Sequence, residues 1–282
     1  MVLVRRAIVL LVTLLVLPRV AAPQVVSLPP DQMEVFLKEA KIINVRDAGN
    51  GTTRSRRATL SDGAFTHDVH IQVINDSKAI FRAGSATELN FKDTYRFNIA
   101  GYQLARLLGL DNVPMSVERR FEGNTAAFTW WIDDVEMDEK ERMKRREVGP
   151  DPQRTSNQIA VMRVFDELIQ NKDRNQGNIL WTRDWKMWLI DHTRAFRTDG
   201  KLMQPNDLTR IEASLLERLR TLDPEAVRAA LKGVATSGEI SAVMRRRDAV
   251  VKLFDERIAK LGEAAVVFTT PQRDGAPETA FR

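Results

Sequence analysis

The sequence contains no cysteine and only three histidines among its 282 residues. The absence of cysteine excludes disulfide bonds and thiolate metal sites, whatever the compartment. Two of the histidines, His67 and His70, stand three residues apart in a segment of strand-like composition. Side chains at that spacing on a strand point to opposite faces of the sheet, so we do not expect these two histidines to share a metal ion.

Long apolar runs are also missing. The segment MVLVRRAIVLLVTLLVLPRVAAPQ at the N-terminus holds an apolar stretch of roughly 12 residues, whereas a membrane-spanning helix needs about 20. Two arginines precede this stretch and small residues follow it, which is the layout of a secretory signal peptide. We therefore expect residues 1–24 to be removed on export, with a retained membrane anchor as the alternative.

The chain has no large excess of either charge. Its formal charge is +5, and three of the arginines, Arg5, Arg6 and Arg19, lie in the expected signal peptide. Removing those three charges leaves about +2, which is too mild to indicate a nucleic-acid or membrane-surface partner. Because 43% of the residues are apolar and 29% are charged, a chain of this length can build a sizeable core.

The hydrophobic pattern changes along the chain. Residues 42–82 show short β-rich runs separated by Gly, Asn, Asp and Ser turns, which predicts an antiparallel meander. Residues 93–109 carry apolar side chains at helical spacing and end at Gly109, a good helix stop. Further on the pattern is mainly helical, so we expect a protein of class α+β, and we expect it to be a monomer. The expected segments are a signal peptide 1–24, a linker with a short helix 25–40, a β-rich N-lobe 41–135, a charged mobile connector or solvated helix 136–154, a helical C-lobe 155–267 and a disordered tail 268–282.

The segment NKDRNQGN, residues 171–178, places Asp173 five residues before Asn178. Taken alone, it is a common polar turn. Asp191 follows thirteen residues later in WLIDHTRAF, beyond two short apolar runs that fit a β-hairpin. Phosphoryl transfer needs a carboxylate near the attacking hydroxyl and hard oxygen ligands for Mg²⁺, and these three side chains supply both.

This constellation resembles the catalytic and metal segments of atypical kinases in the protein-kinase-like superfamily. That group includes the phosphatidylinositol kinases, the HipA-type kinases and the secreted Golgi casein kinases. The upstream run YQLARLLGLDNVPMSVERR resembles their lobe-linking segment. The resemblance implies a two-lobed protein-kinase-like fold, ATP with Mg²⁺ or Mn²⁺, Asp173 as the catalytic aspartate, and Asn178 and Asp191 as metal ligands.

A glycine loop over the nucleotide phosphates is expected in the small lobe. The segment AGNGTT, residues 48–53, lies between two expected strands, and Gly49 and Gly51 would let backbone amides approach phosphate oxygens. A plain Asn-Gly hairpin turn explains this segment almost as well.

The cation that pairs with the phosphates in the related kinases is harder to place. In this chain Gln72 stands at one plausible position for that cation and Arg82 at another. Lys92 is a further candidate, and we favour Lys78 at the start of a strand. The related kinases carry a partner glutamate in the following helix, where this chain has Asn98, and Glu88 in the preceding segment is the expected substitute. The expected nucleotide-binding residues are therefore Gly49, Gly51, Lys78 and Glu88.

Three functions follow from these residues. The first is an exported ATP-dependent kinase acting on a hydroxyl of a protein, lipid headgroup, sugar or small molecule. The second is a catalytically inactive binding or scaffold protein on the same fold, favoured by the missing lysine and by Asn98. The third is transfer of a nucleotidyl group rather than a phosphoryl group.

Overall fold

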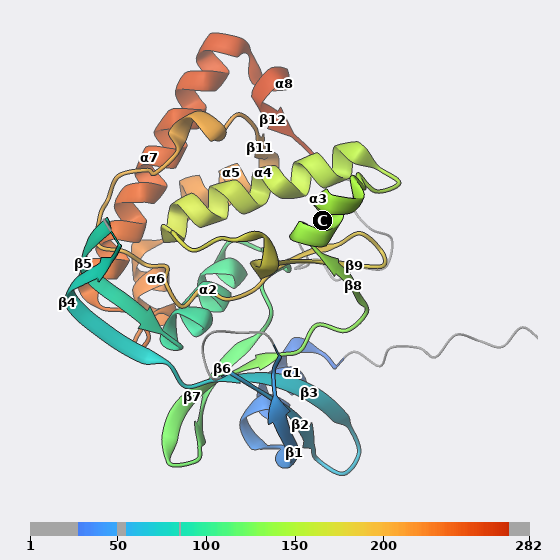
Figure 1. Ribbon diagram of the computed structural model, residues 1–282. Coiled ribbons are helices and arrows are strands. Elements are labelled where there is room, and N and C mark those ends of the chain that lie inside the picture. Colours follow the sequence, from blue (N-terminus) through green and yellow to red (C-terminus); the bar gives the residue numbers. More distant parts are fainter. Residues whose placement is uncertain (1–27, 50–54, 85, 271–282) are drawn as a thin grey trace, which may run out of the picture.

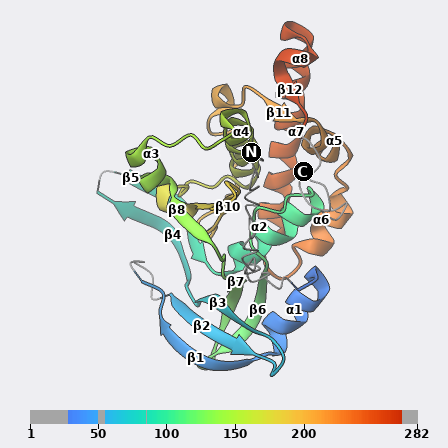
Figure 2. The same ribbon diagram turned by 90° about the vertical axis from the view of Figure 1, so that its right-hand side faces the viewer.

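The protein has a sheet lobe and a helical lobe, with helix α2 lying between them (Figure 1, Figure 2). The structure is a computed structural model that describes residues 28–49, 55–84 and 86–270. The expected signal peptide therefore lies outside the described residues. Within them, no helix is long and apolar enough to cross a membrane.

The sheet lobe is built on five antiparallel strands in the order β1-β2-β3-β7-β6. Alternate residues of the inner strands face the core: Ala58 and Leu60 in β2 and Val69 and Ile71 in β3 are almost fully buried. This alternation is the pattern of a strand with one buried face. The strand bounds are β1 Lys41–Asp47, β2 Arg56–Ser61, β3 Thr66–Gln72, β6 Ser116–Phe121 and β7 Asn124–Trp130.

Two helices pack on this sheet. Helix α1 (Pro30–Glu39) buries Phe36 against Phe65 and Trp130, with ring centroids 5.1 and 5.9 Å away. Helix α2 (Arg96–Leu107) stops where Gly109 adopts a φ of +68°, a left-handed conformation that glycine adopts without steric cost. The helix predicted between residues 93 and 109 is thus confirmed.

The expected meander ends earlier than predicted. Strands β1, β2 and β3 form it, but β3 then pairs with β7 instead of the next strand. Strands β4 (Asn75–Ala83) and β5 (Ala86–Thr94) instead form a separate hairpin that reaches the helical lobe (Figure 1). Lys92 of the hairpin makes an ion pair there with the buried Glu239.

The charged segment 136–154 is not a mobile connector, and it contains a short helix of which only one residue is buried, close to the solvated-helix alternative. Strand β8 (Val135–Asp138) pairs with β9, and the short helix α3 (Glu139–Arg145) follows it directly. Glu139 is buried, where it accepts a hydrogen bond from the Trp181 indole at 2.7 Å and pairs with Arg142. The segment packs despite its many charges, because the buried Glu139 carboxylate is paired with Arg142 and accepts the Trp181 indole N–H.

The helical lobe follows the predicted pattern and shares one continuous apolar core with the sheet lobe. Its hairpin of β9 (Ile179–Thr182) and β10 (Met187–Leu189) confirms the hairpin expected between Asn178 and Asp191.

Phe268, where the tail was expected to begin, is instead buried in strand β12, and residues 271–282 lie outside the described range. The remaining elements are α4 Pro152–Ile169, η1 Gln176–Asn178, η2 Pro205–Asp207, β11 Ile211–Glu212, α5 Ala213–Thr221, α6 Pro224–Ala230, α7 Ser237–Leu261, α8 Glu263–Val266 and β12 Val267–Phe268.

Candidate nucleotide and metal site

A cleft of about 630 Å³ lies between the lobes. Both lobes line it: β3 and α2 from one side, and the loop after α4 and the segment after β10 from the other. Asp173, Asn178 and Asp191 all line this one cleft. The structure therefore brings together the three residues that the sequence singled out for catalysis and metal binding.

The loop that carries Asp173 and Asn178 is shaped by its own polar side chains. Helix α4 ends at Gln170, which has a left-handed φ of +51°. The Asn171 side chain then accepts the backbone N–H of Asp173 at 3.1 Å, and the Asn175 side chain accepts that of Gly177 at 2.9 Å. Such turns explain why asparagine recurs in NKDRNQGN.

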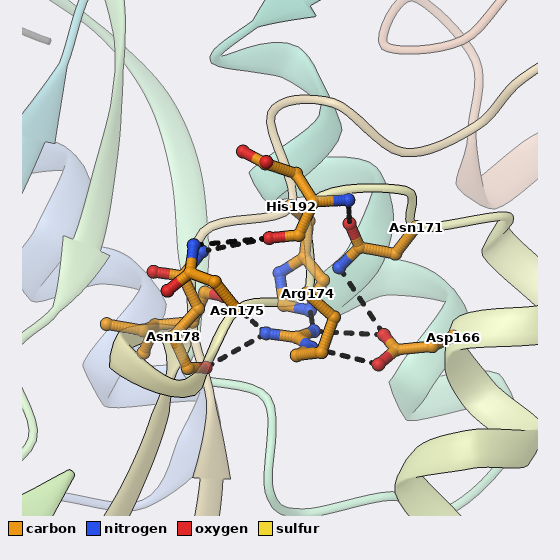
Figure 3. A network of polar contacts seen from close by, with 8 residues as sticks. Asp166, Asn171, Arg174, Asn175, Asn178 and His192 are labelled. Atoms are coloured by element: carbon orange, nitrogen blue, oxygen red, sulfur yellow. Dashed lines mark hydrogen bonds and ion pairs between the residues drawn. The ribbon is translucent and has the colours of Figure 1, made fainter. Parts of the chain in front are cut away.

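Arg174 is the centre of the polar network beneath this loop (Figure 3). Its guanidinium donates to both carboxylate oxygens of the buried Asp166, at 2.9 and 3.0 Å. It also donates to the carbonyl oxygens of Asn178 at 2.9 Å and Ile190 at 2.8 Å. One side chain thus ties the end of α4 to the loop and to the strand end that precedes Asp191. Arg174 has no role in the prediction from sequence, although a charged residue next to a predicted catalytic aspartate could have indicated one.

The β-hairpin brings Asp191 back beside Asn178. The backbone N–H of Ile190 donates to the Asn178 carbonyl at 3.1 Å. Asp191 itself has a φ of +52°, a left-handed conformation that non-glycine residues adopt at a cost and that clusters at functional sites. Its Oδ1 accepts the Thr193 hydroxyl at 3.0 Å, which fixes the side chain without neutralising its charge.

The donor set of this corner fits Mg²⁺ or Mn²⁺. Asp191 offers carboxylate oxygens and Asn178 an amide oxygen, the hard ligands that these ions prefer. The described residues contain no group of three or more His, Cys, Asp or Glu that would hold a metal by themselves. An ion here would therefore complete its shell with phosphate oxygens and water, as Mg²⁺ usually does in phosphoryl-transfer sites.

His192 is held neutral directly beside this corner. Burial, and after it the positive charge of Arg174, puts the pKa of His192 well below its usual 6.5. The contact with Arg174 agrees with this, because the guanidinium only donates and His192 Nε2, at 3.1 Å, must accept.

His192 should therefore make folding stability depend on pH. Below about pH 6.5 the unfolded chain binds a proton at this residue that the folded chain refuses, so stability falls as pH falls. The expected slope is about 1.4 kcal/mol per pH unit for this residue. The pKa of His70 is also lowered by burial, which adds in the same direction.

Urea unfolding between about pH 7 and pH 5.5, the range in which histidines titrate, measures this slope. His192→Gln keeps an acceptor for Arg174 and removes the titration, so its slope should be shallower than that of the wild type. Equal slopes in the two proteins would show that His192 takes up its proton in the folded state.

The expected phosphate-binding residues are placed differently. Lys78 does not line the cleft: its ammonium pairs with Asp76 at 2.7 Å on the exposed side of β4. Gln72 lines the cleft instead, because β3 remains in the main sheet while β4 leaves it. Gly49 has a φ of +102°, which glycine tolerates, whereas Gly51 lies outside the described residues.

Glu88 does not meet Lys78 either. Its carboxylate pairs with Arg197 at 2.8 Å and approaches Arg194 at 3.5 Å. Arg194 in turn lies 3.4 Å from the Asp173 carboxylate. The hairpin β4–β5 is thereby linked to Asp173 through Arg194, a residue that the sequence analysis quoted but did not assign. Burial also raises the pKa of the Asp93 carboxyl, which lies on β5 of the same hairpin.

Aromatic side chains form the linker side of the cleft. Trp131, which lines it, lies under the Arg57 guanidinium at 3.9 Å from the ring centroid. Trp130 stacks on His67 at 3.9 Å, and His67 binds Asp133 at 2.7 Å. His70 lines the cleft on the same strand as His67.

The arrangement of the lobes, the hairpin and the cleft is that of the protein-kinase-like fold, and the predicted fold class is confirmed. Solved structures show the same fold. Hydra Fam20 with sugar matches with a TM-score of 0.62 at 17% identity, covering 83% of this chain and 90% of that chain. The Golgi casein kinase with Mn/ADP bound gives 0.62 at 14% identity, covering 86% and 80%.

A third structure is the Helicobacter pylori proinflammatory kinase CtkA, with a TM-score of 0.51 at 10% identity, covering 80% of this chain and 98% of that one. No family model and no curated protein matches the sequence. The similarity therefore lies in the fold.

Proposed function

We propose that the protein is an exported atypical kinase that transfers a phosphoryl group from ATP to a hydroxyl acceptor with Mg²⁺ or Mn²⁺. The observation that carries the proposal is the convergence of Asp173, Asn178 and Asp191 on one cleft between the lobes. The likeness to kinase structures, one of them solved with Mn/ADP, supports the same reading.

Each residue has a role in this scheme. Asp173 would orient the acceptor hydroxyl and take its proton. Arg194, 3.4 Å from Asp173, would hold that carboxylate in place. Asn178 and Asp191 would hold the metal ion, which supplies positive charge against the phosphate oxygens when bound. Trp131 would pack beside the nucleotide base at the linker.

Export is proposed from the N-terminal sequence, and the resemblance to a Golgi casein kinase structure agrees with a secretory location. A secretory lumen that imports ATP would supply the nucleotide. The acceptor is proposed only as a hydroxyl compound: protein, lipid headgroup, sugar and small molecule all fit the chemistry assigned to Asp173.

The Asp173→Asn variant tests the proposal directly. With labelled ATP and Mn²⁺, the wild-type protein should show autophosphorylation or ATP turnover, and the variant should lose at least about 100-fold of that rate, because general-base contributions are usually of this size or larger. Stabilisation by Mn²⁺ and ADP should persist, since Asn178 and Asp191 are unchanged.

Asp255→Asn is the matched control, because Asp255 is an exposed acid on α7 paired with Arg220 at 2.5 Å. Turnover that is equal in the wild type and in Asp173→Asn would rule out a catalytic role for Asp173.

The other two candidates are an inactive scaffold, which the absence of a lysine from the described lining of the cleft favours, and nucleotidyl transfer. Mass spectrometry of the reaction products separates the two reactions, because a kinase adds phosphate and a nucleotidyl transferase adds AMP. A protein that binds Mn²⁺ and ADP but forms neither product would be a scaffold on the same fold.

A further inference from the structure

Two neutral amides occupy the inner corner of the cleft, where β3 meets α2. Asn98 Nδ2 donates to Gln72 Oε1 at 2.8 Å, and both side chains line the cleft. Gln72 is 2% exposed and Asn98 is 6% exposed. The pair is therefore a built part of the cleft wall, not a surface contact.

The same asparagine reaches the segment that carries Asp191. The backbone N–H of His192 donates to Asn98 Oδ1 at 2.7 Å. Because a backbone N–H can only donate, this bond fixes Oδ1 as the acceptor and leaves Nδ2 to donate to Gln72. Helix α2 passes close here: a Cβ at Gly101 would lie 3.2 Å from the His192 ring. Asn98 thus joins β3, α2 and the residue next to Asp191.

One of the two carboxylates that line the cleft, Asp191, has no ion-pair partner among the described residues. The described lining of the cleft includes two carboxylates, Asp173 and Asp191, and no lysine or arginine. Lys78 and Lys92, the nearest lysines in sequence after β3, are paired elsewhere with Asp76 and Glu239. Arg194, 3.4 Å from Asp173, offsets the charge of that carboxylate, so a polyphosphate that entered without a metal would meet the Asp191 carboxylate across a partly desolvated space, where like charges repel more strongly than in water.

We propose that Gln72 and Asn98 form an uncharged clamp that takes the place of a phosphate-binding cation, so that the cleft accepts a nucleotide only as its complex with a divalent metal. Asn98 acts as a positioning residue for Asp191 through the His192 backbone, and Gln72 keeps the corner neutral. This inference rests on the proposed nucleotide-dependent function, and it adds the form in which the nucleotide is bound.

Calorimetry and thermal unfolding with ADP, in Mn²⁺ or in EDTA, test the clamp without relying on turnover. ADP with Mn²⁺ should bind and stabilise the wild type, whereas ADP in EDTA should bind at least tenfold more weakly. Gln72→Lys places a cation in this corner of the cleft and should raise the affinity for metal-free ADP by about tenfold, because charge-assisted bonds to phosphate are strong. A gain of this kind cannot arise from a damaged fold.

The positioning role of Asn98 has its own readout. Asn98→Leu removes both amide bonds at similar volume and should raise the Mn²⁺ concentration for half-maximal ADP binding by 10- to 100-fold, the usual effect of losing a residue that orients a metal ligand. Asn98→Asp keeps an acceptor for the His192 N–H, and the Gln72 amide can rotate to donate to it. This variant should therefore retain most of the metal affinity.

The outcomes separate the two proposals. Equal ADP affinity of the wild type in EDTA and in Mn²⁺ would overturn the neutral clamp and leave the kinase proposal standing. No ADP binding under either condition would defeat both. Unchanged metal-free affinity in a folded Gln72→Lys protein, or unchanged Mn²⁺ dependence in Asn98→Leu, would also contradict the clamp.

Discussion

Replacing Asp191 by Asn is expected to abolish both phosphoryl transfer and the stabilisation of the protein by Mn²⁺ and ADP. Asp191 brings the carboxylate of the metal corner, on the strand end held beside Asn178. Asn keeps an acceptor for the Thr193 hydroxyl, so the local turn should survive while the charge is lost. The rate should fall by more than about 100-fold, since even residues that only orient a metal ligand account for 10- to 100-fold.

Thermal unfolding measures the binding side of this prediction. A ligand at about 100 times its Kd stabilises a protein by about 2.7 kcal/mol, and this increment should vanish in Asp191→Asn. Asp199→Asn is the matched control, because Asp199 is an exposed acid eight residues later whose side chain accepts the nearby Lys201 N–H at 3.0 Å and does not line the described part of the cleft. Wild-type stabilisation of Asp191→Asn by Mn²⁺ and ADP would remove Asp191 from the metal site.

The Arg174→Met variant should lose the most stability of any substitution in the loop. It leaves the buried Asp166 carboxylate without its partner and removes the donor to two backbone carbonyls. Removing one partner of a buried ion pair costs about 3–5 kcal/mol. In a protein of this size that loss lowers the Tm by about 10 °C, which calorimetry would measure.

Two further variants separate the ion pair from general damage. Arg183→Met changes an exposed arginine that lies 3.6 Å from Glu136, and its effect should stay within about 0.5 kcal/mol. The double variant Asp166→Asn/Arg174→Met should be more stable than the sum of the two single effects predicts, because the unpaired buried charge is gone. Additive effects would mean that Arg174 and Asp166 are not energetically coupled.

The helical lobe and the loop that carries Asp173 could be predicted because their signals are local. Apolar residues at helical spacing and the stop at Gly109 are written in short windows of sequence. The spacing of Asp173, Asn178 and Asp191 is also local once a hairpin is assumed between the last two. Their convergence on one cleft follows from chain connectivity across that hairpin.

The pairing of β3 could not be predicted in the same way, and it decided which side chains face the cleft. Alternation indicates that a segment is a strand but does not name its neighbour. Since β3 pairs with β7 and β4 leaves with β5, Gln72 faces the cleft and Lys78 faces solvent. Glu88 was likewise placed by the hairpin, against Arg194 and Arg197.

The sequence by itself therefore determined the α+β division through its periodicity, and it predicted the kinase-like fold and the acidic half of the candidate site through motifs that resemble those of atypical kinases. Only the tertiary structure decided the neutral half. The contact of Gln72 with Asn98, and of Asn98 with the His192 backbone, joins residues 26 and 94 positions apart. Such contacts depend on how strand, helix and hairpin pack, and no local pattern encodes them. The charged segment before α4 shows the same limit, because the burial of Glu139 depends on Trp181, a distant residue.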